Sequence, residues 1–348
     1  MADERTIGGG YQPDADGDEA SLRPARLGDF IGQERLRENL GVFISAARGR
    51  RESLDHVFFS GPPGLGKTTL AAIIATEMDA ELHSTSAPAL EKTGDLVAIL
   101  TNIGAHNVFF IDEIHRMRPP VEELLYTAME DNEIDVVVGQ GPGARSIKIP
   151  LPPFTLVGAT TKTGLVSGPL YSRFGITMRL DFYAAREIAA IVRRSGGILQ
   201  AELDGAAVKR LAQCSRGTPR VANRLVRRMR DFAQVWGDGT ISAPIVKRGL
   251  AALEVDGYGL DKLDREILDT IISKYDGGPV GSETLAISIS EAVDTLEDVY
   301  EPYLIQRGFL QRTARGRVVT RLAYEHLGYP PPGGGSRDDG DGDQQVLF

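Results

Sequence analysis

The run from Gly61 to Thr69, Gly-Pro-Pro-Gly-Leu-Gly-Lys-Thr-Thr, has the residue types and the spacing that hold a polyphosphate. It fits the P-loop pattern G-x-x-x-x-G-K-[ST], in which glycines let backbone N–H groups turn toward phosphate oxygens. Lys67 is expected to reach the β- and γ-phosphates, and the Thr68 hydroxyl to ligate Mg²⁺. The sequence therefore predicts a site for a nucleoside triphosphate with its magnesium ion.

The segments on either side of this loop strengthen the prediction. Residues 56–60 have the apolar character of a short strand, and residues 69–78 that of an apolar helix. A helix presents the positive end of its dipole to an anion at its N-terminus. The alternative, a chance loop of glycine and proline, does not account for this strand–loop–helix order.

A second chemical group follows about 45 residues later, where the apolar run 108–111 ends in Asp112 and Glu113. Asp112 is expected to hold Mg²⁺, directly or through water. Glu113 is expected to lie near the γ-phosphate, where a carboxylate can orient or deprotonate an attacking water. Two surface acids in a strand–helix turn are the alternative interpretation.

Hydroxyl groups end a third apolar run, 155–159, at Thr160 and Thr161. There they can hydrogen-bond the γ-phosphate or the attacking water, and we place Thr161 among the predicted catalytic residues. Threonines after a strand are equally common as helix caps, so this pattern by itself leaves both interpretations open.

Two arginines are candidates for sensing or stabilising phosphate charge. Arg173 has a position that suits a side chain reaching across a subunit boundary to the ATP of a neighbour, where it would stabilise transition-state charge. An ordinary surface arginine is the alternative. Arg220 follows Gly-Thr-Pro and opens the helix predicted over 221–232, so it is a candidate sensor that brings a helical block onto the phosphates.

The elements that must position these groups come from an ordinary globular composition. The chain has 348 residues, 42% of them hydrophobic and 25% charged, with a net charge of −9. This charge argues against a surface coated in nucleic acid, although a local basic site remains compatible with it. The single cysteine, Cys214, suits a reducing cytoplasm, and no apolar run approaches the length of a membrane span.

The chain divides into segments of different character. Candidate buried parallel strands lie at 56–60, 108–112 and 154–159, between helical stretches, which predicts an α/β fold with helices covering a mostly parallel sheet. The expected segments are a disordered start (1–20), a large ATPase domain (21–183), an arginine-rich helical lid (184–255), a head domain (256–330) and a disordered acidic tail (331–348).

The head segment has the pattern of a winged helix-turn-helix. Three helices are predicted, the third over 295–305 despite Pro302, followed by a hairpin over 308–320. Basic side chains gather in and around this hairpin, in contrast to the acidic chain as a whole, which predicts a grip on DNA phosphates. They are Arg307, Arg312, Arg315, Arg317 and Arg321. A solvated charged hairpin is the alternative.

A second hairpin is predicted over 133–150, inserted between the catalytic strands. Apolar residues alternate on both sides of a Gly-Gln-Gly-Pro-Gly run at 139–143. Such an insertion has no evident role in hydrolysis, and exposed apolar residues more often mark a partner site. The alternative is a hairpin buried against its own domain.

Taken in order, these motifs resemble the AAA+ ATPases, and more closely the RuvB family, the bacterial motors that drive branch migration of Holliday junctions. The resemblance covers roughly 21–330. It rests on the P-loop together with Leu-Arg-Pro at 22–24, Asp-Glu-Ile-His-Arg at 112–116, Gly-Ala-Thr-Thr at 158–161, Gly-Thr-Pro-Arg at 217–220, Gly-Gly-Pro-Val-Gly at 277–281, Tyr-Glu-Pro-Tyr-Leu-Ile-Gln at 300–306 and Gly-Phe-Leu-Gln-Arg-Thr at 308–313.

The resemblance implies a set of site residues. ATP contacts are implied at Leu22, Arg23, Gly64, Lys67, Thr68, Thr69, Tyr183 and Arg220. A finger is implied at Arg173, with Glu130, Asp131 and Asn132 at the same subunit boundary. DNA contacts are implied at Arg312 and Arg317, with Arg315 as a further candidate. For Tyr183, packing at a hinge between two domains is the alternative to nucleotide contact.

The resemblance also implies how the protein works. It implies a cytoplasmic homohexameric ring around double-stranded DNA that consumes ATP with Mg²⁺ in recombination, repair and the SOS response. The hairpin 133–150 is implied to dock onto RuvA, and RuvC to join as the resolvase. Two residues depart from the family pattern, since Val293 and Tyr171 stand where arginines are usual.

Two other functions share part of these features. A clamp-loader-like or protein-remodelling AAA+ ATPase has the first two blocks, and the arginine-rich head argues against it. A winged-helix transcription factor that merely binds nucleotide would require neither Glu113 nor Arg173.

Overall fold

The structure is a computed structural model, and it describes residues 21–138 and 145–331. The chain forms two compact units, residues 1–259 and 260–348. The predictions for the two ends of the chain lie outside the described residues. Among the described residues, no helix is long and apolar enough to cross a membrane, and no group of three or more His, Cys, Asp or Glu side chains is arranged to hold a metal ion.

A five-stranded parallel sheet forms the centre of the first unit, in the order β2-β3-β6-β1-β7. Its strands are β1 (Val57–Ser60), β2 (Leu82–Ser86), β3 (Val108–Asp112), β6 (Thr155–Thr160) and β7 (Ile176–Arg179). The predicted α/β fold is therefore confirmed, and the three predicted strands are the three central ones. Strands β2 and β7, whose sequences mix apolar and polar residues, were not predicted, and both lie at edges of the sheet.

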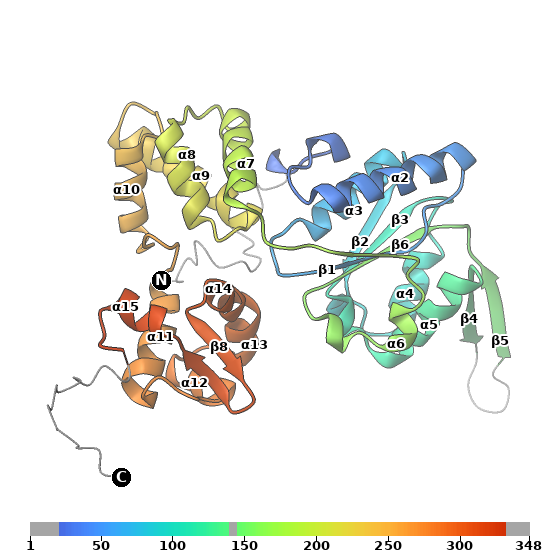
Figure 1. The fold of residues 1–348 in the computed structure, drawn as a ribbon. Coiled ribbons are helices and arrows are strands. Elements are labelled where there is room, and N and C mark those ends of the chain that lie inside the picture. Colours follow the sequence, from blue (N-terminus) through green and yellow to red (C-terminus); the bar gives the residue numbers. More distant parts are fainter. Residues whose placement is uncertain (1–20, 139–144, 332–348) are drawn as a thin grey trace, which may run out of the picture. The chain divides into compact units, whose positions relative to one another are not determined.

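Helices cover both faces of the sheet (Figure 1). Alternate strand residues face opposite clusters: Phe59 and Phe110 pack with α2 and α3, whereas Phe58 and Phe109 pack with α4 and α5. The helices are α2 (Glu34–Arg50), α3 (Lys67–Glu77), α4 (Thr93–Leu100), α5 (Pro119–Glu130) and α6 (Gly168–Tyr171), and the 3-10 turns are η2 (Leu27–Asp29), η3 (Ala87–Ala89), η4 (Ile114–Arg116) and η6 (Thr163–Leu165).

The predicted inserted hairpin is present as β4 (Glu133–Val138) and β5 (Arg145–Pro150), which pair antiparallel. Its base packs on its own domain, because Ile134 is fully buried against the α4 and α5 side of the core. Farther along β5, Ile147 is 49% exposed. The hairpin is thus anchored at its base and presents an apolar side chain farther out. Its turn, 139–144, lies outside the described residues.

Four helices form the rest of the first unit: α7 (Ala185–Ile198), α8 (Gly205–Cys214), α9 (Pro219–Trp236) and α10 (Ala243–Ala252). Their apolar faces join the same continuous core as α2 and α3. Cys214 is buried in this core, and burial raises the pKa of its thiol to about 11.

The second unit has the predicted winged-helix order. Its elements are α11 (Lys262–Tyr275), α12 (Ser282–Ser288), α13 (Val293–Thr295), a π-helical turn η7 (Leu296–Tyr300), α14 (Glu301–Gln306), β8 (Leu310–Thr313), β9 (Gly316–Val319) and α15 (Arg321–Leu327). Pro302 lies in the first turn of α14, where a missing N–H is tolerated. Val280 forms an isolated antiparallel β-bridge with Arg317, so a single residue pairs with β9 as a third strand would.

Candidate nucleotide site and basic wing

The P-loop lies between the carboxyl end of β1 and the N-terminus of α3. All three of its glycines have backbone conformations that side chains rarely adopt: φ is +138° at Gly61, +77° at Gly64 and +107° at Gly66. A Cβ atom at Gly61 would also lie 2.4 Å from the carbonyl oxygen of Leu180. The glycines are therefore required for the turn that directs backbone N–H groups toward a phosphate at the start of α3.

Lys67, the first residue of α3, is 7% exposed. Its Nζ donates to the carbonyl oxygens of Gly61 and Pro62, at 2.7 and 2.9 Å. Burial lowers the pKa of Lys67 to about 8, against the opposing influence of Asp112 and Glu113. The ammonium group is thus held on the phosphate-binding loop in surroundings that favour loss of its proton.

This shifted pKa predicts that nucleotide affinity depends on pH. Phosphate oxygens attract the charged ammonium, and the charged fraction of Lys67 falls as pH rises through 8. The Kd for a fluorescent ATP analogue is therefore expected to rise about tenfold between pH 7 and pH 9. Lys67→Arg is the matched control, because a guanidinium stays charged over this range. An equal rise in that variant would contradict the assignment.

Asp112 and Glu113 lie where β3 ends, next to β6 and one strand removed from β1. Because parallel strands end at one edge of a sheet, the two carboxylates share that edge with the P-loop. The backbone N–H of Glu113 donates to Asp112 Oδ1 at 2.9 Å, and Glu113 adopts a left-handed conformation with φ +51°. Both carboxylates act on the charge of Lys67, which places all three groups at one site.

His115 is a part of this site that sequence reasoning did not identify. Its Nε2 lies 3.5 Å from Glu113 Oε2, and its Nδ1 is hydrogen-bonded to Thr160 Oγ1 at 2.8 Å. The imidazole is 6% exposed, so it links the carboxylate to the end of β6 in a packed position. The signal available in the sequence was a histidine two residues after Glu113, beside a strand that ends in threonines.

We expect His115 to position Glu113. His115→Ala should lower the kcat of ATP hydrolysis by about 10- to 100-fold through misplacement of the carboxylate, with the nucleotide Kd unchanged. His115→Gln retains a polar group of similar reach and should recover part of the rate. Steady-state ATPase measurements with parallel nucleotide titrations test this. Equal rates in the alanine and glutamine variants would rule the positioning role out.

The two threonines differ in their surroundings. Thr160 is fully buried at the end of β6, where its hydroxyl holds His115 and accepts from the backbone N–H of Lys162. Thr161 follows the strand and is partly exposed at the same edge. The predicted catalytic hydroxyl of Thr161 is therefore placed at the site edge, and its contact with phosphate or water stays a prediction.

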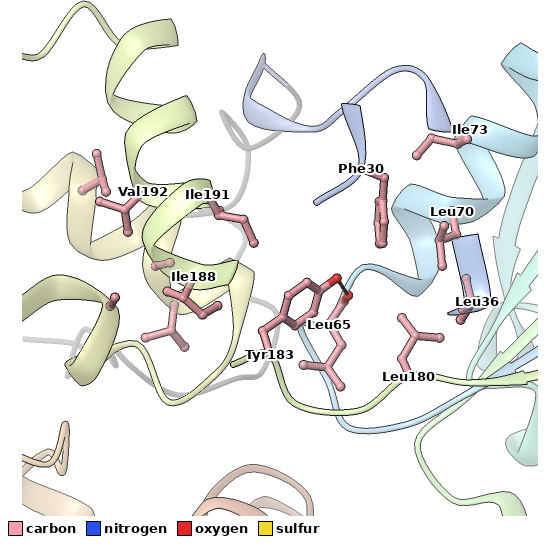
Figure 2. Packing of buried hydrophobic residues seen from close by; sticks show 14 of the residues in the cluster. Phe30, Leu36, Leu65, Leu70, Ile73, Leu180, Tyr183, Ile188, Ile191 and Val192 are labelled. Atoms are coloured by element: carbon pink, nitrogen blue, oxygen red, sulfur yellow. Dashed lines mark hydrogen bonds between the residues drawn. The ribbon is translucent and has the colours of Figure 1, made fainter. Parts of the chain in front are cut away.

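Tyr183 joins the lid to the P-loop (Figure 2). Its hydroxyl donates to the carbonyl oxygen of Leu65 at 3.0 Å, and its backbone N–H donates to Gly217. The side chain is 6% exposed, and a Cβ atom at Gly32 would lie 2.7 Å from its ring. Burial raises the pKa of this phenol, which keeps it a donor. Packing at the hinge is the contact that the structure gives it, and a nucleotide contact stays a prediction.

Two further contacts tie the lid to the residues predicted to touch ATP. The backbone N–H of Arg220, in the first turn of α9, lies 3.4 Å from the carbonyl oxygen of Gly64. The carbonyl oxygen of Leu22 accepts from Arg194 of α7 at 2.7 Å, and Leu22 is 1% exposed. Arg23 follows Leu22, and Thr68 and Thr69 lie in the first turn of α3. The structure thus places Arg220 beside the P-loop and Leu22 against α7, and the contacts of these residues with ATP stay predictions.

Arg173 lies at the other end of the sheet. It comes three residues before β7, which begins beside the start of β1, with Val57 opposite Ile176. The P-loop follows the far end of β1, and four residues of strand span about 13 Å. Arg173 therefore lies on the side of the domain opposite to its own P-loop.

The guanidinium of Arg173 belongs to a polar surface cluster. Its Nη2 lies 3.1 Å from Glu130, its Nη1 donates to Pro169, and its plane covers the Tyr126 ring at 4.4 Å. Its Nε has no hydrogen-bond partner in the part of the chain that the structure describes. Asp131 and Asn132 follow Glu130 at the end of α5. The structure thus brings together Arg173 and Glu130, both predicted for a subunit boundary.

The three predicted DNA-binding arginines of the second unit differ in exposure. Arg315 lies exposed in the turn between β8 and β9, and the side chain of Arg312 is 51% exposed. Arg317 is buried, with 8% of its side chain exposed, and its Nε donates to Glu301 at 2.7 Å. In this structure the guanidinium of Arg317 is held by Glu297 and Glu301 and supports the hairpin, so its contact with a DNA phosphate stays a prediction.

Arg317→Ala is expected to destabilise the second unit by about 3–5 kcal/mol, because it leaves the Glu301 carboxylate buried without its principal partner. Thermal unfolding followed by circular dichroism measures the loss. Arg315→Ala is the matched control, since an exposed turn arginine contributes little to stability. A melting temperature equal to that of the control would contradict the structural role.

The parallel sheet, the P-loop, the acidic strand end and the helical lid define this chain as an AAA+ ATPase with an added winged-helix unit. Models of three protein domain families match consecutive parts of the chain. They are the Holliday junction DNA helicase RuvB P-loop domain over 22–180, the RuvB AAA lid domain over 183–256 and the RuvB C-terminal winged helix domain over 257–328. The chain belongs to the RuvB family.

Individual relatives agree with this assignment. The Holliday junction branch migration complex subunit RuvB of Treponema denticola is 58% identical over 340 residues, 98% of this chain and 99% of that one. Its counterpart in Treponema pallidum is 60% identical over 90% of each chain. The solved structure of the Thermotoga maritima RuvB Holliday junction branch migration motor matches with a TM-score of 0.83 and 50% identity, over 90% of this chain and all of that one.

Proposed function

We propose that this chain is the ATP-hydrolysing subunit that drives branch migration of Holliday junctions in recombination and DNA repair. One observation supports the proposal above all. A single chain combines a P-loop and an acidic strand end with an arginine-bearing winged hairpin, and it matches RuvB family models from residue 22 to residue 328. It works in the cytoplasm as a homohexameric ring around double-stranded DNA.

Hydrolysis is assigned to groups at one edge of the sheet. The P-loop and Lys67 hold the β- and γ-phosphates, while Glu113 orients a water molecule and accepts its proton. The water oxygen bonds to the γ-phosphorus as the bond from that phosphorus to the bridging oxygen of ADP breaks. Thr68 and Asp112 would hold Mg²⁺, which neutralises phosphate charge. Their hydroxyl and carboxylate oxygens are the hard donors that this ion prefers.

The ring is supported by the position of Arg173. Because this side chain lies opposite to its own P-loop, it is suited to complete the site of the next subunit, with Glu130, Asp131 and Asn132 at the same boundary. A head-to-tail contact of this kind closes into a ring when its rotation permits. Hydrolysis of ATP at this boundary changes the contacts between two subunits, and the second subunit thereby responds to the nucleotide of the first.

Partners are assigned to two surfaces. The winged hairpin contacts DNA phosphates through Arg312 and Arg315, and a contact through Arg317 stays a prediction. The hairpin of β4 and β5, with Ile147 exposed, docks onto RuvA, and RuvC joins the complex that resolves the junction. The clamp-loader-like alternative accounts for the sheet and the lid but leaves the winged unit without a role.

The direct test is ATPase activity of the full chain with a synthetic four-way junction and RuvA, compared with linear duplex and with no DNA. The proposal predicts stimulation by the junction with RuvA, together with conversion of the junction into two duplex products. Matched amounts of the Lys67→Ala variant control for contaminating ATPases. Hydrolysis indifferent to DNA, with the junction left intact, would contradict it.

A further inference from the structure

Two arginines and two glutamates meet on one face of the winged hairpin, one residue pair from its turn. Arg312 and Arg317 are cross-strand partners on β8 and β9, so they share one face of the hairpin. Arg312 Nη2 lies 3.0 Å from Glu297 and 3.2 Å from Glu301. Arg317 lies 2.6 Å from Glu297 and 2.7 Å from Glu301. Each arginine is therefore shared by both carboxylates.

Burial divides these four side chains into a fixed pair and an outer pair. Glu301 and Arg317 are 2% and 8% exposed and make two hydrogen bonds, which fixes their geometry. Glu297 is 27% exposed and Arg312 51%. Arg312 can therefore leave the cluster, whereas Glu297 keeps Arg317 as a partner when it does.

From this arrangement we propose that Glu297 competes with DNA phosphate for Arg312 and thereby sets the strength of the wing's grip. The inference rests on the proposed function, since it deepens the DNA contact assigned to the hairpin. Glu297 is then an attenuating residue: Arg312 must exchange a carboxylate for a phosphate each time it binds. A grip weakened in this way suits a motor that has to release DNA repeatedly.

The exchange has a consequence for salt dependence. An arginine that neutralises a phosphate on duplex DNA normally contributes about 0.9 to the slope of log K against log salt, through released counterions. Salt weakens the partly exposed ion pair between Arg312 and Glu297 as well as the contact between Arg312 and phosphate, so exchanging one for the other offsets part of this slope. Arg312 therefore adds less to the slope while Glu297 is charged and more once Glu297 is neutral.

The experiment measures binding of a fluorescent duplex to full-length protein with a non-hydrolysable ATP analogue and Mg²⁺, across a series of salt concentrations. Glu297→Gln removes the charge and keeps the shape. It is expected to tighten binding by about two- to fivefold, the range of a partly exposed ion pair. The slope should steepen by up to about 0.9 for each subunit that contacts DNA. Thermal unfolding of each variant confirms that the wing remains folded.

A double-mutant cycle gives the decisive comparison. Arg312→Ala alone should weaken binding, and Glu297→Gln should have no further effect in the Arg312→Ala background. Equal tightening in both backgrounds would show a general charge effect and overturn the inference, as would no tightening in either. If Arg312→Ala itself left binding unchanged, the DNA contact in the proposed function would fall as well.

Discussion

Replacing Arg173 by alanine is expected to lower the kcat of ATP hydrolysis by about 10³- to 10⁵-fold, the range measured for arginine fingers. The nucleotide Kd should stay near that of the unaltered protein, because the P-loop of the same chain lies at the opposite end of β1. The rate is measured by phosphate release, and affinity by titration with a fluorescent nucleotide. The two readouts separate transition-state stabilisation from binding.

A matched control distinguishes this role from a general loss of surface charge. Arg50 also forms an ion pair, with Glu52, but lies at the end of α2. Arg50→Ala should retain full activity. Arg173→Ala subunits should also poison mixed rings, since each one disables a neighbour's site. Normal ATP turnover in the Arg173→Ala protein would show that Arg173 does not complete the ATP site of a neighbouring subunit.

Glu113→Gln is expected to lower kcat by about 10²- to 10⁴-fold, because an amide cannot accept the proton of the attacking water. Binding should persist, since Lys67 and the P-loop are untouched, so the variant should hold intact ATP. Single-turnover quench experiments, followed by chromatography of the bound nucleotide, test this directly.

The matched control for this carboxylate is Glu81→Gln, at an exposed acid that precedes the edge strand β2. It should turn over ATP at the unaltered rate. A Glu113→Gln protein that released phosphate at that same rate would show that another group activates the water, and the site would need a different base.

Much of the fold followed from local sequence. Strands β1, β3 and β6 are buried on both faces, and a strand buried in this way is predicted by a continuous apolar run such as Val108–Ile111. Strand β2, Leu-His-Ser-Thr-Ser, lies at an edge and is only partly buried, so its sequence lacks such an apolar run. Its place is fixed by pairing with β3, a contact between segments distant in sequence.

The candidate site divides in the same way. Lys67 and Glu113 belong to short motifs whose spacing predicts their chemistry. The link from His115 to Thr160 joins residues 45 apart in sequence and exists only because β3 and β6 are neighbours. The burial of Arg317 likewise depends on carboxylates of η7 and α14, and its sequence alone equally suits an exposed wing.

We expect the ATP site to be completed by a neighbouring subunit, and mixing two inactive variants tests this directly. Lys67→Ala lacks the phosphate-binding ammonium, and Arg173→Ala lacks the finger. In mixed rings, an Arg173→Ala subunit next to a Lys67→Ala subunit regains one intact site. An equal mixture should recover up to about a quarter of full ATPase activity if subunits assemble at random. No recovery, with subunit exchange verified by labelled protein, would contradict the shared site.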